Sequence, residues 1–327
     1  MLRRPRLGRR HVVQQPSDVN PADLEACRAV IAVHSKSFHA ASHLLPSTLR
    51  DAAVATYAFC RGADDDVDDA ANAVDAAQRH AGTRDRLARI YAGAALHTPV
   101  ERAFAWVVRR FGIPRSEPEA LLDGMAQDLD VVRVANEDEL LAYCYRAAGV
   151  VGLMMSRIMG RGDVAALRRA VDLGMAMQLT NIARDVGEDA RRNRVYLPQD
   201  WLAAAGSSHA QVLAGVNTPQ IAAVNRRVLA LAERYYQSGL DGIALLPASC
   251  RPAILAAAFI YRQIGIKVLA QDGDGMTSRA RVSGWAKARL AATAVLWCVF
   301  GPRFHRQNPP QHPADLHAPL RRLNLAP

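Results

Sequence analysis

The sequence predicts an all-α protein with a single large helical domain. Alanine, leucine and arginine are abundant and aromatic residues make up only 6% of the chain, which favours helices over sheets. Apolar residues recur at helical spacing, and no segment alternates like a half-buried strand. With 327 residues, 50% of them hydrophobic, the chain can bury a large core. We expect this domain to cover residues 21–300, between a disordered basic arm at 1–20 and a disordered proline-rich tail at 301–327.

Caps and breakers divide the domain into successive helices. The first begins near Pro21 with Asn20 as its N-cap, and Pro46 separates it from the next. Glycine, threonine and proline punctuate two connecting helices within residues 70–115. The other expected helices cover residues 49–69, 121–128, 140–155, a segment around 178–189, 208–240, 254–270 and a last segment that ends near 301.

The net charge of +10 is concentrated in the two terminal segments. Residues 1–16 contribute +5 and residues 303–327 contribute +3, so 10 − 8 = +2 remains for everything between them. No nucleic-acid motif accompanies these segments, and we expect no nucleic-acid partner; loose attraction to anionic lipid is the alternative. Only three lysines occur in the chain, at positions 36, 267 and 287.

Cysteine usage and hydropathy favour a cytoplasmic protein. The five cysteines are scattered without disulfide or zinc spacing, which points to a reducing compartment. The N-terminus has charge but no apolar core of a secretory signal. The apolar run from Leu290 to Gly301, about 12 residues, is too short to cross a bilayer. We therefore expect a soluble protein or one bound peripherally to the inner face of the membrane.

Two acidic rows are the main functional signal. Asn181, Asp185 and Asp189 follow each other at steps of four, so on a helix they share one face. Asp64 and Asp68 form a second pair at the same spacing. Like charges so placed call for an external cation, and Mg²⁺ prefers oxygen ligands completed by substrate phosphates. Either row alone could instead be a solvated helix face, but two together favour a magnesium-bound diphosphate site.

Small and flexible residues in the apolar helices have two interpretations. Gly149 and Gly152 either let two helices approach closely or leave room for a long apolar guest, and core packing is the more common role. The methionine pairs at 154–155 and at 175 and 177 are likewise more often core filler than ligand lining.

Several motifs in a fixed order resemble the squalene/phytoene synthase family and, within it, the bacterial phytoene synthases. The resemblance covers roughly residues 24–290. It is carried by Ser35-Lys-Ser-Phe38, Tyr57-Ala-Phe-Cys-Arg61 with the aspartates of 64–69, Asp123-Gly-Met-Ala-Gln-Asp128, Tyr143-Cys-Tyr-Arg-Ala-Ala-Gly-Val-Val-Gly152, and residues 178–189 followed by Arg194-Val-Tyr-Leu-Pro198.

The resemblance implies a fold and a reaction. The fold is a single isoprenoid-synthase (class I terpenoid synthase) domain, whose helices surround a central cavity with the acidic rows facing each other across its mouth. The reaction joins two geranylgeranyl diphosphates head to head, through prephytoene diphosphate, to 15-cis-phytoene in carotenoid biosynthesis. It requires Mg²⁺ or Mn²⁺, and because it ends with loss of a proton, no NADPH is expected. An apolar cavity would protect the carbocation from water.

The resemblance also assigns roles to individual residues. Asp66, where the family usually has an apolar residue, departs from the pattern, and Arg281 is the alternative to Arg279. The implied metal ligands are Asp64, Asp68, Asn181, Asp185 and Asp189; the implied catalytic residues are Asp64, Asp68, Asp185, Asp189, Arg61 and Tyr57. The implied substrate contacts are Ser35, Lys36, Ser37, Tyr57, Arg61, Tyr143, Gln178, Arg184, Tyr196, Tyr261 and Arg279, with Ala148, Tyr143 and Tyr196 as cavity residues.

Three alternatives to this function stay open. A family member that joins two farnesyl diphosphates would make a C30 product, namely dehydrosqualene, squalene or hydroxysqualene. A non-catalytic relative would act as an assembly or lipid-binding factor and would show eroded acidic rows. A basic membrane- or nucleic-acid-binding protein would depend on residues 1–16 and 303–327. Peripheral membrane association and contact with downstream carotenoid enzymes are further expectations.

Overall fold

The computed structural model describes residues 19–306 and 308–325. Its regular elements are helices, and β-pairing within these ranges is limited to one isolated bridge between Arg133 and Val195. Residues 1–18 of the expected basic arm lie outside the described residues. The α-helices are α1 (Pro21–His34), α2 (Lys36–Ser42), α3 (Ser47–Asp68), α4 (Ala73–Ala92), α5 (Pro99–Phe111), α6 (Ser116–Ala126), α7 (Glu137–Cys144), α8 (Val150–Ile158), α9 (Val164–Arg191), α10 (Gln199–Ala204), α11 (His209–Leu213), α12 (Pro219–Asp241), α13 (Arg251–Leu269), α14 (Gly284–Phe300) and α15 (Ala318–Arg322). Shorter helical turns are η1 (Gln127–Leu129), the π-helix η2 (Tyr145–Gly149), η3 (Gly242–Leu245) and η4 (Pro302–His305).

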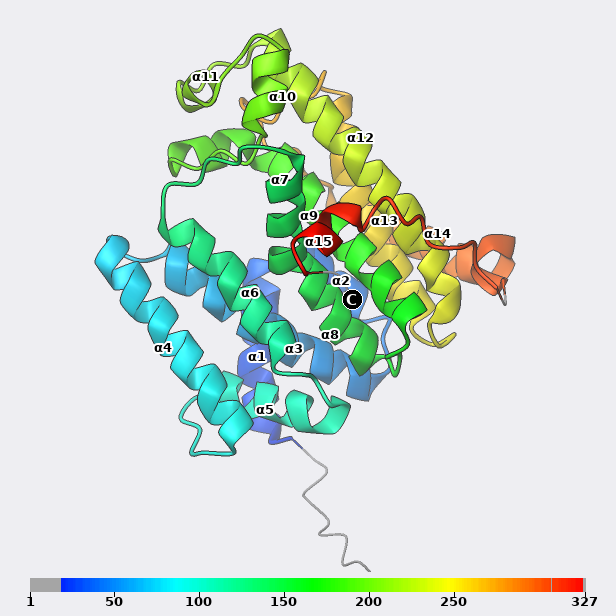
Figure 1. Cartoon of the computed structure of the whole chain (residues 1–327). Coiled ribbons are helices and arrows are strands. Elements are labelled where there is room, and N and C mark those ends of the chain that lie inside the picture. The colour runs from blue at the N-terminus through cyan, green and yellow to red at the C-terminus, as the bar shows by residue number, and fades with distance from the viewer. Residues whose placement is uncertain (1–18, 307, 326–327) are drawn as a thin grey trace, which may run out of the picture.

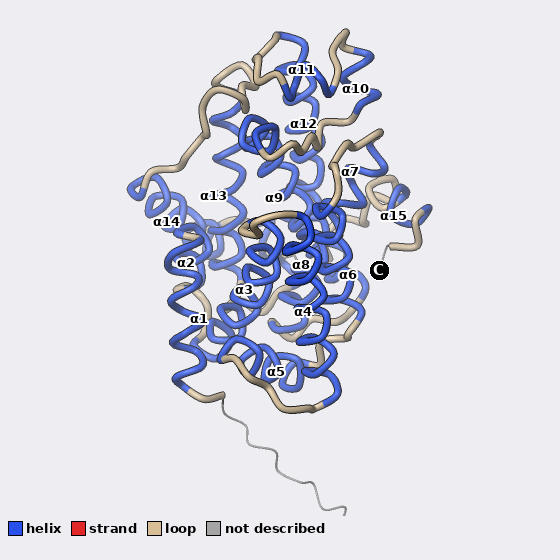
Figure 2. The backbone as a smooth tube through the Cα atoms, turned by 90° about the vertical axis from the view of Figure 1, so that its left-hand side faces the viewer, coloured by secondary structure: helices blue, strands red, loops and turns tan. Residues whose placement is uncertain are grey.

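Helix α9 runs through the middle of the molecule, with α8, α12 and α13 packed around it (Figure 1, Figure 2). Glycine permits two of these contacts. A Cβ atom on Gly152 would lie 2.2 Å from the carbonyl oxygen of Ala170, and one on Gly174 would lie 2.3 Å from that of Ala148. The close-approach interpretation of Gly152 is therefore correct, and the helix backbones touch where side chains would hold them apart.

Capping residues define the helix boundaries much as the sequence indicates. Asn20 accepts a hydrogen bond from the backbone of Ala22, and α1 begins at Pro21 as predicted. The single helix expected over 208–240 is wrong: α11 and α12 are separate. Gly215 between them adopts φ = 72°, which ends the first helix, and Thr218 caps the second.

One described helix, α13, is long and apolar enough to cross a membrane. More than half of its most apolar window is buried inside the protein. It packs against α9, α12 and α14, so in this structure it is a core helix.

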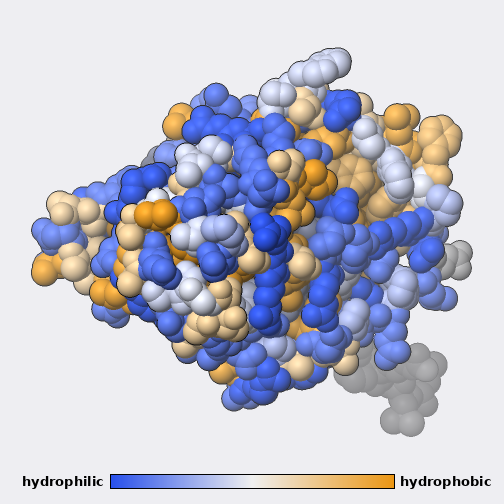
Figure 3. All heavy atoms as spheres, turned by 90° about the horizontal axis from the view of Figure 1, so that it is seen from above, coloured by the Kyte–Doolittle hydropathy of each residue, from blue (hydrophilic) through white to orange (hydrophobic). Residues whose placement is uncertain are grey.

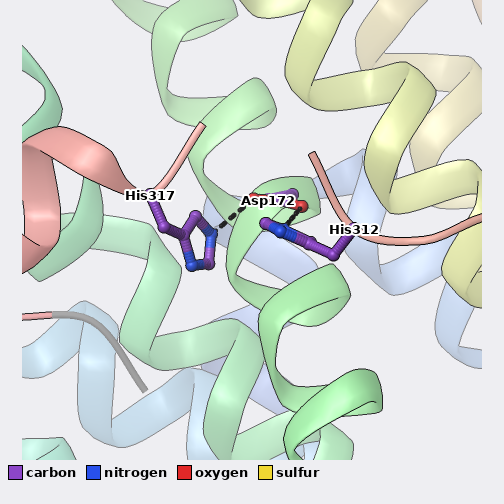
Figure 4. Close-up of side chains that lie close together, drawn as sticks. All are labelled: Asp172, His312 and His317. Atoms are coloured by element: carbon purple, nitrogen blue, oxygen red, sulfur yellow. Dashed lines mark hydrogen bonds and ion pairs between the residues drawn. The ribbon is translucent and has the colours of Figure 1, made fainter. Parts of the chain in front are cut away.

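The expectation of a disordered C-terminal tail is wrong for the described residues up to 325. Phe304, Leu316 and Leu320 are buried, so this segment has its own apolar anchors. It also meets α9 at Asp172, a fully buried carboxylate that accepts hydrogen bonds from His312 at 2.8 Å and His317 at 2.7 Å (Figure 4). Composition suggested disorder because proline and arginine are frequent here, but it does not reveal a buried partner elsewhere in the chain.

This C-terminal strap, defined as the described residues 302–306 and 308–325, has further polar attachments. The hydroxyl of Tyr235 donates to the carbonyl of Leu316 at 2.7 Å, and Arg251 donates to the carbonyl of Phe304 at 2.8 Å. Arg303 pairs with Asp241 at 2.7 Å. The strap is therefore part of the folded body.

Candidate active site

Helix α9 presents the second acidic row to one end of a cavity. Asp185 is bound by two arginines: Arg184 donates to Oδ1 at 2.8 Å, and Nε of Arg279 lies 2.9 Å from the same atom. Arg279 also reaches Glu188 at 3.1 Å. Of the two candidates in this loop, Arg279 faces the row, whereas the carbonyl of Arg281 accepts from Lys267.

Helix α3 supplies the first row. Arg61 donates to Asp64 at 2.8 Å and also pairs with Asp65. Burial, followed by the nearby charge of Asp68, raises the pKa of Asp64 to about 6. Asp66 points elsewhere: it bonds to Thr83 and Arg86 on α4. The extra aspartate therefore joins α3 to α4 rather than adding charge to the site.

Asp128, in the η1 turn that follows α6, lies between the two rows. It accepts hydrogen bonds from the hydroxyls of Tyr196 at 2.6 Å and Tyr143 at 3.2 Å. Its pKa is raised by burial despite these donors, and the charge of Asp68 raises it further. Burial and then Asp185, together with Asp128, hold the pKa of Asp189 well above its usual range. The sequence motif contained Asp128, but no helical spacing connected it to either row, and its role was missed.

Two arginines after α9 close the same cluster. Arg194 lies 2.7 Å from Asp68 and donates to the carbonyl of Asp128 at 3.3 Å. Arg192 also pairs with Asp68. These two arginines therefore join the end of α9 to the end of α3, and this brings the two rows together although more than a hundred residues separate them in sequence.

A cavity of about 310 Å³ extends from this polar end into the helical body. Tyr57, Gln178, Asn181 and Tyr261 form its polar rim. Its other walls are mainly apolar and come from α2, α3, α8, α9, α12 and α13. Ala148, Gly152, Met155 and Met177 line it, so these small and flexible residues face the cavity, while Met154 and Met175 are fully buried core.

The other predicted substrate residues fall into two groups. Ser35 caps α2 beside the hydroxyls of Tyr57 and Tyr261, and burial raises the pKa of Tyr57 to about 12. Lys36 and Ser37 follow on α2, with Lys36 exposed. Tyr143 and Tyr196, implied as cavity residues, are not among the residues that line this cavity. Both are buried, their hydroxyls are 3.1 Å apart, and both hydroxyls donate to Asp128.

The donor set fits a divalent cation. The side-chain oxygen of Asn181 is buried and has no hydrogen-bond partner. Burial raises the pKa of Asp64, Asp128 and Asp189 although arginines lie nearby, and a bound cation would favour the charged form of each carboxylate. Oxygen ligands of this kind are those that Mg²⁺ prefers. Asp64, Asp68, Asn181, Asp185 and Asp189 would hold the ions, and Asp128 adjoins them.

A separate group of metal-ligating residues, Asp172 with His312 and His317, lies on the strap side of α9 (Figure 4). Each imidazole bonds a different carboxylate oxygen, and the hydroxyl of Ser238 donates to one of them. Nδ1 of His317 is buried without a partner, whereas a metal-bound histidine normally donates its second nitrogen. The group is arranged as a hydrogen-bonded clasp.

Comparisons with known proteins agree with this geometry. The squalene/phytoene synthase family model matches residues 31–286. A phytoene synthase of Rhodobacter capsulatus is 44% identical over 297 residues, covering 89% of this chain and 88% of the relative. A 15-cis-phytoene synthase of a Paracoccus species is 42% identical, covering 80% and 86%. A solved dehydrosqualene synthase superposes with a TM-score of 0.78 at 30% identity, covering 84% of this chain and 96% of that structure. The chain therefore belongs to the squalene/phytoene synthase family.

Proposed function

We propose that this protein is a phytoene synthase, which condenses two geranylgeranyl diphosphates through prephytoene diphosphate to 15-cis-phytoene. Relatives that carry this name are 39–44% identical over most of the chain. The acidic rows are intact and converge, which argues against a non-catalytic relative. The main alternative to this function is a C30 synthase that acts on farnesyl diphosphate. The structural likeness to a dehydrosqualene synthase supports this alternative.

The length of the cavity is the observation that favours the longer substrate. Along α9 the lining runs from Asn181 to Ala166, which is 181 − 166 = 15 residues, or about 22 Å at the helical rise. An extended chain advances about 1.2 Å per bond, so a geranylgeranyl chain of about 16 main-chain carbons spans about 19 Å and a farnesyl chain about 14 Å. A geranylgeranyl chain therefore extends along most of this lining, whereas a farnesyl chain stops well short of its far end.

The polar end has the groups that ionisation of an allylic diphosphate requires. Arg61, Arg184 and Arg279 pair with the carboxylates, and Lys36 is the first residue of α2, whose later residues line the cavity. Divalent cations, when bound, neutralise charge on the departing diphosphate. The arginines orient its oxygens, since guanidinium groups bind phosphate in a fixed geometry. We propose Mg²⁺ or Mn²⁺ as the metal and no requirement for NADPH.

The apolar walls govern what happens after the diphosphate leaves. Between the polar rim and Arg169 the walls are mainly alanine, glycine, leucine, isoleucine and methionine, which bind water poorly, so few water molecules would lie near the carbocation. The phenols of Tyr57 and Tyr261 stay protonated because burial raises the pKa of each. The cation can therefore rearrange and lose a proton rather than be captured.

Product analysis tests the proposal. Purified protein is incubated with Mg²⁺ and either geranylgeranyl or farnesyl diphosphate, each with and without NADPH. A C40 triene without NADPH supports phytoene synthase. A C30 product would identify farnesyl diphosphate as the substrate and leave the assignment of the site unchanged. No product from either substrate would favour the non-catalytic alternative.

We propose a cytoplasmic location with peripheral attachment to the inner face of the membrane. The substrates and product of the proposed reaction partition into lipid, which supports this placement. Enzymes that desaturate the product are the expected downstream partners. Fractionation of cells into membrane and soluble protein tests the location, and recovery in the soluble fraction alone would count against it.

A further inference from the structure

Helix α14 exposes large apolar side chains on its outer face. Trp285 is 81% exposed and Phe300 is 76% exposed, with Leu296 and Val299 between them at 56% and 58%. At 100° per residue these four lie within about 100° of each other, and Ala294, the buried residue of the helix, lies opposite. A surface helix normally turns polar residues outward, so this arrangement is reversed.

The exposed residues gather in one region of the surface. Figure 3 shows hydrophobic side chains clustered at the upper right of the view, on the side where Figure 1 places α14. The inner side of the helix packs against α13 and α2, and Trp297 contacts Phe259 and Phe304 there. A contiguous exposed apolar surface of this kind marks an interaction site. We call the outer face, from Trp285 to Phe300, the α14 face.

The charge around the α14 face has one sign. Residues 275–314 contain no aspartate or glutamate and six arginines or lysines. Arg289 lies on the face itself. All three lysines of the chain meet at this corner: Lys267 donates to the carbonyl of Arg281, and Lys287 lies within electrostatic range of Lys36. Lysine suits a lipid surface because its long stem can lie among apolar groups while the amine reaches the headgroups.

Helix α14 adjoins the elements of the proposed active site. Its inner side packs against α2 and α13, which both line the cavity, and Lys36 at the start of α2 lies within electrostatic range of Lys287. Arg279, five residues before the start of α14, binds Asp185. A surface that held α14 would therefore lie beside the cavity wall and the polar rim together.

We propose that the α14 face docks on an anionic lipid bilayer, and that α14 lies in the plane of the interface. This inference rests on the proposed function, because geranylgeranyl chains and phytoene are lipids that must enter and leave the cavity from such a surface. A helix of 17 residues is about 26 Å long and falls short of the ~30 Å hydrocarbon core. Tryptophan and phenylalanine with basic neighbours are typical of interfacial helices. The uniform positive charge favours anionic lipid over a second copy of this chain, whose own α14 face would repel it.

Vesicle binding tests the apolar contribution. Full-length protein is sedimented with vesicles of phosphatidylcholine alone or mixed with phosphatidylglycerol. Replacing Leu296, Val299 and Phe300 together with glutamine should lower partition by at least about tenfold, since their apolar area no longer enters the lipid. The matched control replaces Val74, Val131 and Val216 with glutamine; these are 57–67% exposed elsewhere, and binding should not change.

Charge reversal tests the lipid specificity. Arg289→Glu should reduce binding to vesicles with phosphatidylglycerol by more than about fivefold, the value of a single cation near an anionic surface. Binding to phosphatidylcholine should change little. Higher salt should weaken the binding of the wild-type protein to vesicles with phosphatidylglycerol toward the level measured for Arg289→Glu.

Turnover separates this inference from the proposed function. With substrate dispersed in detergent, the triple glutamine variant should match the wild type, and with substrate embedded in vesicles it should be slower. If the wild type made no product, the proposed function would be rejected, and the vesicle-binding results would still test the docking of the α14 face. Equal vesicle binding by the triple variant and wild type would overturn the inference. So would a dimer in sedimentation equilibrium that the triple variant abolishes, because a second copy would then cover the face.

Discussion

Replacing Ala170 with phenylalanine tests whether cavity length selects the substrate. Ala170 lines the cavity from α9 and is 181 − 170 = 11 residues from Asn181, or about 17 Å along the axis. A farnesyl chain of about 14 Å would end before this point, and a geranylgeranyl chain of about 19 Å would pass it. A phenyl ring there should therefore exclude the last isoprene unit of the longer chain.

The size of the effect follows from the burial that is lost. The excluded unit has about five carbons, and at roughly 0.8 kcal/mol each its exposure costs about 4 kcal/mol. At about 1.4 kcal/mol per decade, the ratio of kcat/KM for geranylgeranyl over farnesyl diphosphate should fall by about 10³. The ring occupies space that is open in the wild type, so folding should be affected less than in a filled core.

Steady-state kinetics with each substrate, combined with mass analysis of the products, gives this ratio. The matched control is Ala165→Phe, because Ala165 is exposed on the same helix. If Ala170→Phe lost both activities equally, or kept the wild-type ratio, the cavity along α9 would not measure chain length.

Three other perturbations test the site and the strap. Asp64→Ala or Asp185→Ala should lower the rate of diphosphate release by at least about 10³-fold. The circular dichroism spectrum should stay unchanged, and Mg²⁺ should raise the Tm of the variant less than that of the wild type. Unchanged turnover would reject the metal-site assignment. His317→Ala should lower the free energy of unfolding by about 3 kcal/mol, because it removes a partner of a buried carboxylate, and a wild-type urea midpoint would contradict the clasp. Burial alone would raise the pKa of Asp172, but the bonds from His312 and His317 outweigh it and lower that pKa. The stability that this lowered pKa gives is present above the unfolded pKa and is lost below about pH 4. In Asp172→Asn this contribution to the acid-induced fall in Tm should be missing. A fall in Tm identical to that of the wild type would contradict the assignment.

Helical spacing alone was sufficient to identify the α9 row. Asn181, Asp185 and Asp189 lie on one turn-by-turn row, so their proximity is a local property of a helix. The all-helical class was likewise predictable, since it depends on composition and periodicity along the chain. The pairing of α3 with α9 was inferred from resemblance, because no local signal states which helices meet.

The features that sequence reasoning missed all depend on contacts between distant segments. Asp128 joins the site through Tyr143 and Tyr196, and neither distance nor burial can be read from a motif. The resemblance implied that the same two tyrosines line the cavity, whereas in the structure their hydroxyls bind Asp128. The strap looked disordered because His317 and its buried partner Asp172 lie 145 residues apart.

Charge along α9 explains how one helix serves both ends of an apolar cavity. Its acidic row faces the rim, while Arg169 lines the opposite end and donates to Ser238 at 2.7 Å and to the carbonyl of Pro310 in the strap. In a low-dielectric cavity a carbocation is attracted by the departed diphosphate and repelled by this guanidinium, so the reacting carbons stay near the rim. Arg169→Met should therefore increase the share of prenyl alcohols formed by water capture, measured by gas chromatography with mass detection. An unchanged share of prenyl alcohols would mean that Arg169 only anchors the strap. A larger share would mean that the strap contributes to the mechanism, because it holds the Arg169 guanidinium in place.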